Sequence, residues 1–329
     1  MKTENKNYIL KNGRVVDPSR GIDAAGDIGI QDGRICEPKR VKNPQTIDVK
    51  GLVIAPGLID MHVHLRQPGR NDKETIQSGT MAAAAGGFTT VVAMPNTSPP
   101  ADNPGTIEYI RLLSERKGFV NVLPCACITK AQEGKEMVGI GGLKKAGAAA
   151  LSDDGKCVQN HEIMRHVMEY SKSFGIPILD HCEDEILSSG GLMHEGRWSV
   201  LLGIRGITSA SEELMIARDI ILSEHTGCPI HIQHISSVAG VRMLRNAQKR
   251  KISVSAEAAP HHIALTDECM KSFDSNYKMN PPLRSEKDRL AIIEGLKDGT
   301  ISVIASDHAP HTETEKLVAH TPPLVDQHL

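Results

Sequence analysis

Leu58-Ile-Asp-Met-His-Val-His-Leu65 is a short apolar run with two histidines near its carboxyl end. Side chains alternate between the two faces of a β-strand, so His62 and His64 share one face. Two imidazoles aimed at one point suit a zinc ion. A His-x-His pair can also consist of hydrogen-bonded histidines that face inward from a strand. The interpretation therefore depends on what the rest of the chain adds.

Seven similar runs follow, and amphipathic stretches typical of helices fill most of the gaps between them, which is the pattern of βα units. Helical patterns span residues 160–174, 211–224 and 285–297, and Gly175 and Gly227 mark helix ends. Eight parallel strands predict an α/β fold, a (β/α)8 TIM-like barrel. The eight predicted strands are residues 58–65, 89–96, 120–129, 148–155, 177–183, 229–237, 252–262 and 301–311.

Three β-like runs precede the barrel, at residues 8–16, 27–33 and 46–54. Asn12-Gly13 and Asp32-Gly33 are strong hairpin-turn signals. This segment is too short to form a stable sheet domain alone, so we expect a small, incomplete N-terminal β-sandwich domain. The expected divisions of the chain are the small β-domain at 1–55, the barrel at 56–316 and a divergent tail at 317–329.

Composition excludes several classes of partner. Lys and Arg total 38 against 40 Asp and Glu, so we expect neither a nucleic-acid nor a membrane partner. No apolar run approaches the roughly 20 residues of a membrane span, and the first residues are polar rather than an apolar signal core. The seven cysteines show neither redox nor zinc-ribbon spacing, which indicates reduced thiols. We therefore expect a cytoplasmic protein that binds a small molecule or another protein.

Polar residues gather at the carboxyl ends of the predicted strands, the face at which barrel active sites lie. A single histidine there is more often a capping or hydrogen-bonded residue, but six strand ends at once favour a site. Four histidines and Asp307 exceed the three protein ligands of a catalytic zinc, which predicts two metal ions and a bridging ligand, Asp153 or Asp154. The gathered residues are His62, His64, Asn96, Asp153, Asp154, His181, His234, His261, His262, Asp307, His308 and His311.

Six motifs, in this order, resemble the dihydroorotase family of the amidohydrolase superfamily, and the resemblance extends to about Lys316. Gln67 departs from the pattern, because many relatives have an acidic residue there; we expect a mild effect. The motifs are Pro56-Gly-Leu-Ile-Asp-Met-His-Val-His-Leu-Arg-Gln-Pro-Gly69, Ala93-Met-Pro-Asn-Thr97, Ser152-Asp-Asp-Gly155, Asp180-His-Cys-Glu-Asp184, Lys278-Met-Asn-Pro-Pro-Leu-Arg284 and Ala305-Ser-Asp-His-Ala-Pro-His311.

The resemblance implies two Zn2+ ions per chain. It assigns His62, His64 and Asp307 to one ion and His181 and His234 to the other. The superfamily often bridges its two ions with a carbamylated lysine, but the dihydroorotase branch that this chain resembles carries an aspartate. That position is Asp154, with Asp153 as the alternative.

The activity implied is the reversible hydrolysis of the cyclic amide of (S)-dihydroorotate to N-carbamoyl-L-aspartate, in de novo pyrimidine biosynthesis. Arg66 at a strand end would otherwise be read as a salt-bridge partner, but the resemblance makes it a ligand of the substrate carboxylate, together with Asn96 and His311. Asn280 is implied to bind the ring amide. Asp307 is implied to act as general base and then as general acid.

Two alternatives differ from this interpretation. A hydantoinase or allantoinase has the same barrel and a similar metal set, although Asp154, Arg66 and Asn96 argue against it. An inactive dihydroorotase-like scaffold that binds aspartate transcarbamoylase is the second, and the full ligand set argues against it. We expect a homo-oligomer, with aspartate transcarbamoylase as a candidate partner.

After Glu315-Lys316 the sequence no longer resembles the family. Relatives continue with a helix that covers the barrel and with strands that complete the small sheet. We therefore expect a truncated product whose exposed edges and apolar surface favour aggregation or obligatory assembly. The expected consequence is weak or no activity for the isolated chain.

Overall fold

The structure is a computed structural model that describes residues 7–318, with side-chain surroundings given as far as residue 317. The chain divides into two compact units, residues 1–58 and 59–329. The first contains a β-sheet and the second a (β/α)8 barrel, so the predicted fold class is confirmed.

The N-terminal unit contains one five-stranded sheet among its described residues, with strand order β3-β2-β1-β4 and β5 paired to β1. β2 runs antiparallel to β1, whereas β4 and β5 run parallel to it. The mixed pairing draws the three predicted runs into a single sheet. The strands are β1 (Tyr8–Asp17), β2 (Ile22–Gln31), β3 (Arg34–Cys36), β4 (Gln45–Asp48) and β5 (Val53–Ile54).

The two predicted hairpin turns have different outcomes. Asp32 and Gly33 adopt left-handed φ values of 54° and 72° between β2 and β3, which confirms that turn. The prediction for Asn12-Gly13 was wrong, because these residues form a bulge inside β1, where the pairing with β2 shifts register. Asn12 has a φ of 64°, which suits a bulge as well as a turn. A Cβ at Gly13 would lie 2.6 Å from the side chain of Ile54, so β5 packs closely here.

The barrel contains all eight predicted strands, in the order β15-β14-β13-β10-β9-β8-β7-β6. The pairs from β7 to β15 are parallel. A parallel bridge between Val63 and His308 joins the first strand to the segment after the last, which closes the barrel. The strands are β6 (Leu58–Val63), β7 (Phe88–Ala93), β8 (Asn121–Ala126), β9 (Ala150–Leu151), β10 (Ile178–Asp180), β13 (Ile230–Ile232), β14 (Val254–Ala258) and β15 (Val303–Ile304).

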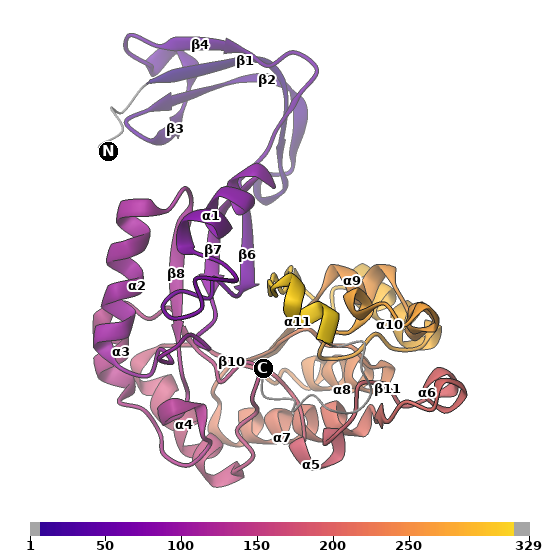
Figure 1. Cartoon of the computed structure of the whole chain (residues 1–329). Coiled ribbons are helices and arrows are strands. Elements are labelled where there is room, and N and C mark those ends of the chain that lie inside the picture. The colour runs from indigo at the N-terminus through magenta and orange to yellow at the C-terminus, as the bar shows by residue number, and fades with distance from the viewer. Residues whose placement is uncertain (1–6, 319–329) are drawn as a thin grey trace. The chain divides into compact units, whose positions relative to one another are not determined.

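Helices cover the outside of the barrel strands (Figure 1). Helix α1 packs on β7, α2 on β8, α7 on β13 and α8 on β14. The three predicted helices correspond to α4, α7 and α10, and Gly175 and Gly227 end α4 and α7 with φ values of 60° and 64°. The helices are α1 (Ile76–Ala85), α2 (Pro104–Lys117), α3 (Ile140–Ala146), α4 (His161–Phe174), α5 (Glu185–Ser188), α6 (Arg197–Leu202), α7 (Ala210–Thr226), α8 (Val238–Lys249), α9 (Pro260–Ala264), α10 (Glu286–Lys297) and α11 (Glu313–Val318).

The short buried strands of the barrel position the polar residues that follow them at its carboxyl end. Every residue of β9, β10 and β13 is buried, and Leu151, Ile178 and Ile232 are fully enclosed in the core. The chain reaches the carboxyl end of the barrel as soon as each short strand stops. A small parallel sheet, β11 (Met193–His194) with β12 (Gly206–Ile207), lies in the β10–α7 connection.

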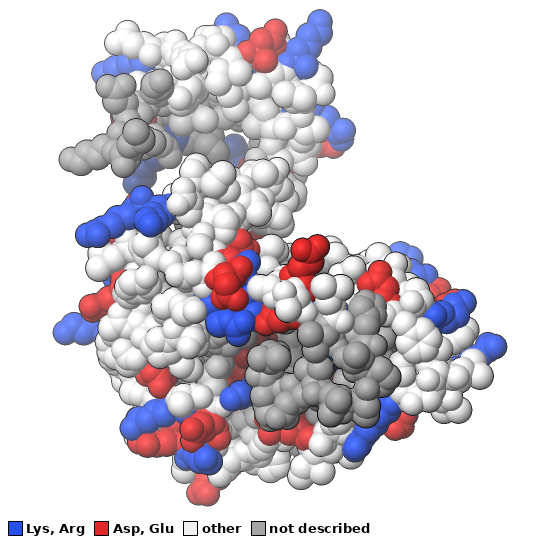
Figure 2. Space-filling view, viewed as in Figure 1, with Lys and Arg blue, Asp and Glu red and all other residues white. Residues whose placement is uncertain are grey.

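Acidic and basic side chains are interspersed over the face shown in Figure 2, as the balanced composition predicts. Among the described residues, no helix is both long and apolar enough to cross a membrane. Of the predicted tail, residues 319–329 lie outside the described part of the chain.

We expect Asn160→Ala to destabilise the barrel unit, because Asn160 caps α4. Its side-chain oxygen accepts hydrogen bonds from the backbone N–H groups of Glu162 (3.0 Å) and Ile163 (3.2 Å). Loss of such a cap costs about 1 kcal/mol in the free energy of unfolding, measurable in urea. Asn246→Ala, at an exposed position within α8, is the control and should not destabilise. Equal stabilities of the two variants would contradict this account of the helix start.

Candidate metal centre

The first and last strands of the barrel bring three predicted ligands together. His62 and His64 lie at the end of β6 and are buried. Their Nε2 atoms lie 3.5 and 3.2 Å from Oδ1 of Asp307, which follows β15. Asp307 has a left-handed φ of 50°, a strained conformation that turns its carboxylate toward the histidines.

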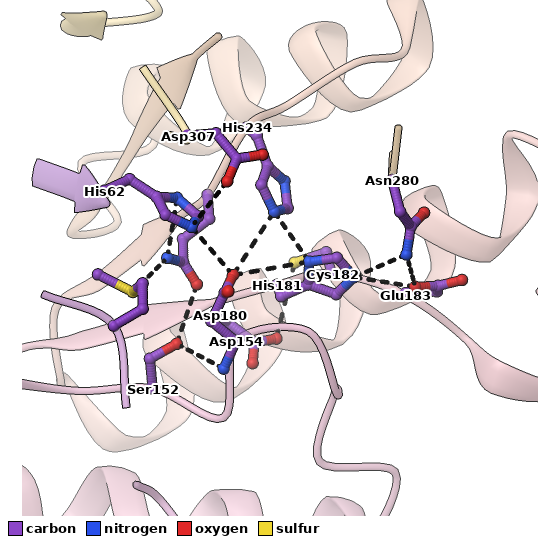
Figure 3. Close-up of polar contacts among 12 residues, drawn as sticks. His62, Ser152, Asp154, Asp180, His181, Cys182, Glu183, His234, Asn280 and Asp307 are labelled. Atoms are coloured by element: carbon purple, nitrogen blue, oxygen red, sulfur yellow. Dashed lines mark hydrogen bonds and ion pairs between the residues drawn. The ribbon is translucent and has the colours of Figure 1, made fainter. Parts of the chain in front are cut away.

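Asp154, on the loop after β9, contacts all four predicted histidine ligands. Its Oδ1 lies 3.2 Å from Nε2 of His62, and its Oδ2 lies 3.2 Å from Nε2 of His64. Oδ1 is also 3.8 Å from Nδ1 of His181 and 3.7 Å from Nε2 of His234. One carboxylate thus stands between ligands from the ends of three other strands (Figure 3).

The neighbouring Asp153 points elsewhere. Its carboxylate accepts hydrogen bonds from the backbone N–H groups of Ile128 (2.8 Å) and Thr129 (3.2 Å) and from the Thr129 hydroxyl. Burial raises the pKa of Asp153 to about 6, although these hydrogen bonds oppose the rise. Asp153 therefore holds the loop after β8, and Asp154 is the aspartate that lies among the histidines.

The donor set fits a metal ion. Nε2 of His62 and Oδ1 of Asp154 are buried 3.2 Å apart, yet neither has a hydrogen-bond partner among the described residues. Nδ1 of His62 lies 2.6 Å from Oε1 of Glu257, so that nitrogen is already occupied. A bare nitrogen facing a carboxylate oxygen in a buried site is unfavourable without a cation between them. Two overlapping groups have metal-ligand spacing: His62, His64 and Asp307, and His62, Asp154 and His234.

A third group with similar spacing contains Asp180, Cys182 and Asp219. Here the cation is part of the protein, because the buried guanidinium of Arg218 lies 2.7 Å from Asp180 and 2.8 Å from Asp219. This cluster was not predicted from the sequence. Arg218 already supplies the positive charge, so we assign no metal to it.

Two residues predicted to bind the substrate carboxylate, Arg66 and His311, lie beside the centre. Arg66 has a left-handed φ of 58°, and its Nε donates to the carbonyl of Pro310 at 3.2 Å. Nδ1 of His311 lies 3.3 Å from Oε2 of Glu315. Partial burial, together with the positive charges of Arg66 and Lys73, lowers the pKa of His311 to about 4. His311 is therefore neutral near pH 7.

The two predicted asparagines are both hydrogen-bonded in this structure. Nδ1 of His64 donates to Oδ1 of Asn96 at 2.8 Å. Nδ2 of Asn280 donates to Oε2 of Glu183 at 2.7 Å, and this carboxylate also lies 2.9 Å from Nε2 of His181. Each asparagine is thus connected to a histidine of the centre.

Gln67, where the sequence departs from the family pattern, has a local role. Its Oε1 accepts the backbone N–H of Ile76, the first residue of α1, at 3.0 Å. An acidic side chain could accept the same hydrogen bond, which gives a physical reason for the mild effect predicted.

Two carboxylates that contact the predicted ligands, Glu183 and Glu257, were not predicted from the sequence. Burial opposes ionisation of Glu183, but its hydrogen bond and ion pair with His181 lower its pKa to about 2. Burial likewise opposes ionisation of Glu257, but His62 and His231 lower its pKa to about 2. For Glu257 a signal was present, because it is the one acidic residue in β14, an otherwise small or apolar strand.

An apolar groove of about 460 Å3 lies elsewhere on the barrel unit, where the start of α3 meets α2 and α4. Tyr170 and Phe174 of α4 line one side of it. It contains none of the predicted site residues.

Comparisons with known proteins agree with these observations. A family described as Dihydro-orotase-like matches residues 51–239. The chain is 49% identical over 313 residues to the dihydroorotase of Acetivibrio thermocellus, covering 94% of this chain and 74% of the relative. It is 50% identical over 315 residues to the dihydroorotase of Pelotomaculum thermopropionicum, covering 95% and 74%.

Solved structures share the fold. The L-hydantoinase (dihydropyrimidinase) of Arthrobacter aurescens superposes with a TM-score of 0.82 at 23% identity, covering 95% of this chain and 71% of that one. At this identity the likeness supports the barrel fold, whereas the identities near 49% over most of the chain show the family. The chain belongs to the dihydroorotase family.

Proposed function

We propose that this protein is a metal-dependent dihydroorotase, which interconverts (S)-dihydroorotate and N-carbamoyl-L-aspartate in de novo pyrimidine biosynthesis. The observation that carries the proposal is the position of Asp154 among four imidazoles, with Asp307 beside them. The identity to dihydroorotases over most of the chain supports the choice of substrate.

The proposed cofactor is a pair of zinc ions. His62, His64 and Asp307 would hold one ion, His181 and His234 the other, and Asp154 would be shared. Nitrogen and carboxylate ligands of this kind suit zinc. Bound zinc lowers the pKa of water toward neutrality and polarises a carbonyl group.

Asp307 is the proposed general base and acid. Burial opposes ionisation of its carboxyl, but His62 and His64 outweigh that effect and hold the pKa of Asp307 well below its usual range. The carboxylate is therefore ionised at neutral pH and can accept a proton from the attacking water. It can then return that proton to the ring nitrogen that leaves when the amide bond breaks.

The substrate carboxylate is assigned to Arg66, Asn96 and His311. A guanidinium presents two parallel N–H donors to a carboxylate, which fixes orientation as well as charge. A neutral His311 can donate one further hydrogen bond. Asn280 lies next to Glu183 and His181 and is assigned to the ring amide.

A hydantoinase is the second candidate, because the structural neighbours include hydantoinases. Hydantoin carries no carboxylate to pair with Arg66, and we therefore place it second. A homo-oligomer and an aspartate transcarbamoylase partner stay predictions from the sequence.

Steady-state assays of the zinc-loaded protein should give the highest kcat/KM with dihydroorotate, compared with hydantoin and allantoin, because only dihydroorotate offers the carboxylate that Arg66 can bind. A higher kcat/KM with hydantoin would favour the second candidate. Turnover of none of the three substrates by a zinc-loaded protein would contradict the proposed activity.

We expect the double variant His62→Ala, His64→Ala to lose bound zinc. The first predicted ion would keep only Asp307 and Asp154 as ligands, and the second would lose the neighbouring His62 side chain. Metal content after dialysis, measured by elemental analysis, is the test. His225→Ala, at an exposed position near the end of α7, should keep the parent's zinc. Full metal content in the double variant would show that the ligands lie elsewhere.

Arg66→Lys should lower kcat/KM for dihydroorotate while zinc content stays at the parent level. The single ammonium of lysine cannot replace the two parallel N–H donors of a guanidinium. The expected loss of transition-state binding is roughly 2 to 4 kcal/mol, which lowers kcat/KM roughly 30- to 1,000-fold. Arg242→Lys, at an exposed position on α8, is the matched control and should be neutral. A parent-like rate in Arg66→Lys would mean that another residue binds the carboxylate.

A further inference from the structure

Glu257 is a buried carboxylate to which the proposed reaction gives no role. It lies in β14 and is 1% exposed. Its Oε1 is 2.6 Å from Nδ1 of His62, and its Oε2 is 3.2 Å from Nε2 of His231. Because β15 stands between β14 and β6 in the closed barrel, the contact with His62 reaches past a neighbouring strand.

This contact determines which nitrogen of His62 is available to a metal. A neutral imidazole carries one proton, and the nitrogen that donates a hydrogen bond is the one that bears it. A carboxylate accepts hydrogen bonds, so Nδ1 bears a proton, and it is the nitrogen that keeps its proton when a metal ion binds at Nε2. The lone pair is then on Nε2, the atom that lies 3.2 Å from Asp154 and 3.5 Å from Asp307.

Glu257 also contacts a predicted ligand of the second ion. The backbone N–H of His234 donates to the same Oε1 at 3.4 Å. His234 has a φ of 29°, in the left-handed region that side chains other than glycine rarely adopt. This hydrogen bond helps to hold a strained backbone in the conformation that aims the ring at Asp154.

Other buried groups hold the Glu257 carboxylate in place. His231 contacts Oε2 with one ring nitrogen, and its Nδ1 lies 2.8 Å from the hydroxyl of Ser255. Nε2 of Gln233 lies 3.2 Å from Nδ1 of His62 and so contacts the ring, not the carboxylate. The carboxylate is held at Oε2 by His231 and at Oε1 by the backbone N–H of His234, as a residue that orients a ligand should be.

We propose that Glu257 is a positioning residue of the metal centre, which keeps His62 in the tautomer with its proton on Nδ1 and steadies the backbone of His234. The inference rests on the proposed metal centre for its consequence, which is tighter metal binding. Its structural part, the tautomer of His62, concerns the metal-free protein and is tested separately.

The test compares Glu257→Leu, which removes the acceptor, with Glu257→Gln, which can still accept the His62 proton through its carbonyl oxygen. The tautomer is read from ¹⁵N NMR of the metal-free, histidine-labelled protein, with the His62 signals assigned by their loss in His62→Gln. Zinc affinity is measured by competition with a chelator. Glu212→Leu is the control, because Glu212 is 2% exposed but bonds to Ser236, outside the predicted ligand set.

We expect the parent and Glu257→Gln to show His62 protonated on Nδ1, and Glu257→Leu to lose that preference. Zinc affinity should fall roughly 10- to 100-fold in Glu257→Leu, less in Glu257→Gln and not at all in Glu212→Leu.

A metal-free parent whose His62 Nδ1 bears no proton would overturn the inference without any variant, even if Glu257→Leu does not fold. So would parent-like affinity in Glu257→Leu, or an equal loss in the Leu and Gln variants. A parent that binds no zinc would instead refute the proposed metal centre. Its NMR spectrum would still show whether Nδ1 of His62 bears a proton.

Discussion

The carboxylate of Asp154, enclosed by four imidazoles, is the constraint on which the polar face of the barrel depends. Oδ1 of Asp154 and Nε2 of His62 lie buried side by side without hydrogen-bond partners among the described residues, which is expensive unless a cation lies between them. The strand ends that carry His62, His181 and His234 must therefore meet at one point. A closed parallel barrel achieves this, because all of its strands present their carboxyl ends on the same face.

The site is built at some cost in backbone conformation. Arg66, His234 and Asp307 all have left-handed φ values, each of which costs on the order of 1 to 3 kcal/mol. They follow β6, β13 and β15 directly, where the adjoining strands and the closing bridge at Val63 fix the backbone. Seven other described non-glycine residues also have positive φ values, but at these three the strained backbone carries a side chain that would contact metal or substrate. This is expected of a site whose geometry is set before ligands bind.

Sequence patterns predicted the barrel well, because a buried strand of two to six residues followed by a polar residue is a local signal. Sequence patterns failed where the local structure depends on residues that lie far away in the sequence. Asn12-Gly13 has the dihedral preference of a turn, but whether it forms a turn or a bulge depends on how β2 and β5 pair with β1. The residue pattern alone left Asp153 and Asp154 both open, because adjacent loop residues diverge in direction; the resemblance named Asp154, which is the aspartate that lies among the histidines. The contact between Glu257 and His62 spans 195 residues of sequence and has no local signature.

Anomalous diffraction from zinc-soaked crystals, recorded at the zinc absorption edge, would show whether two metal ions share Asp154. We expect two peaks, one on each side of the Asp154 carboxylate, the first beside His62, His64 and Asp307 and the second beside His181 and His234. A single peak, or zinc bound at Asp180 and Asp219 with none at Asp154, would contradict this expectation.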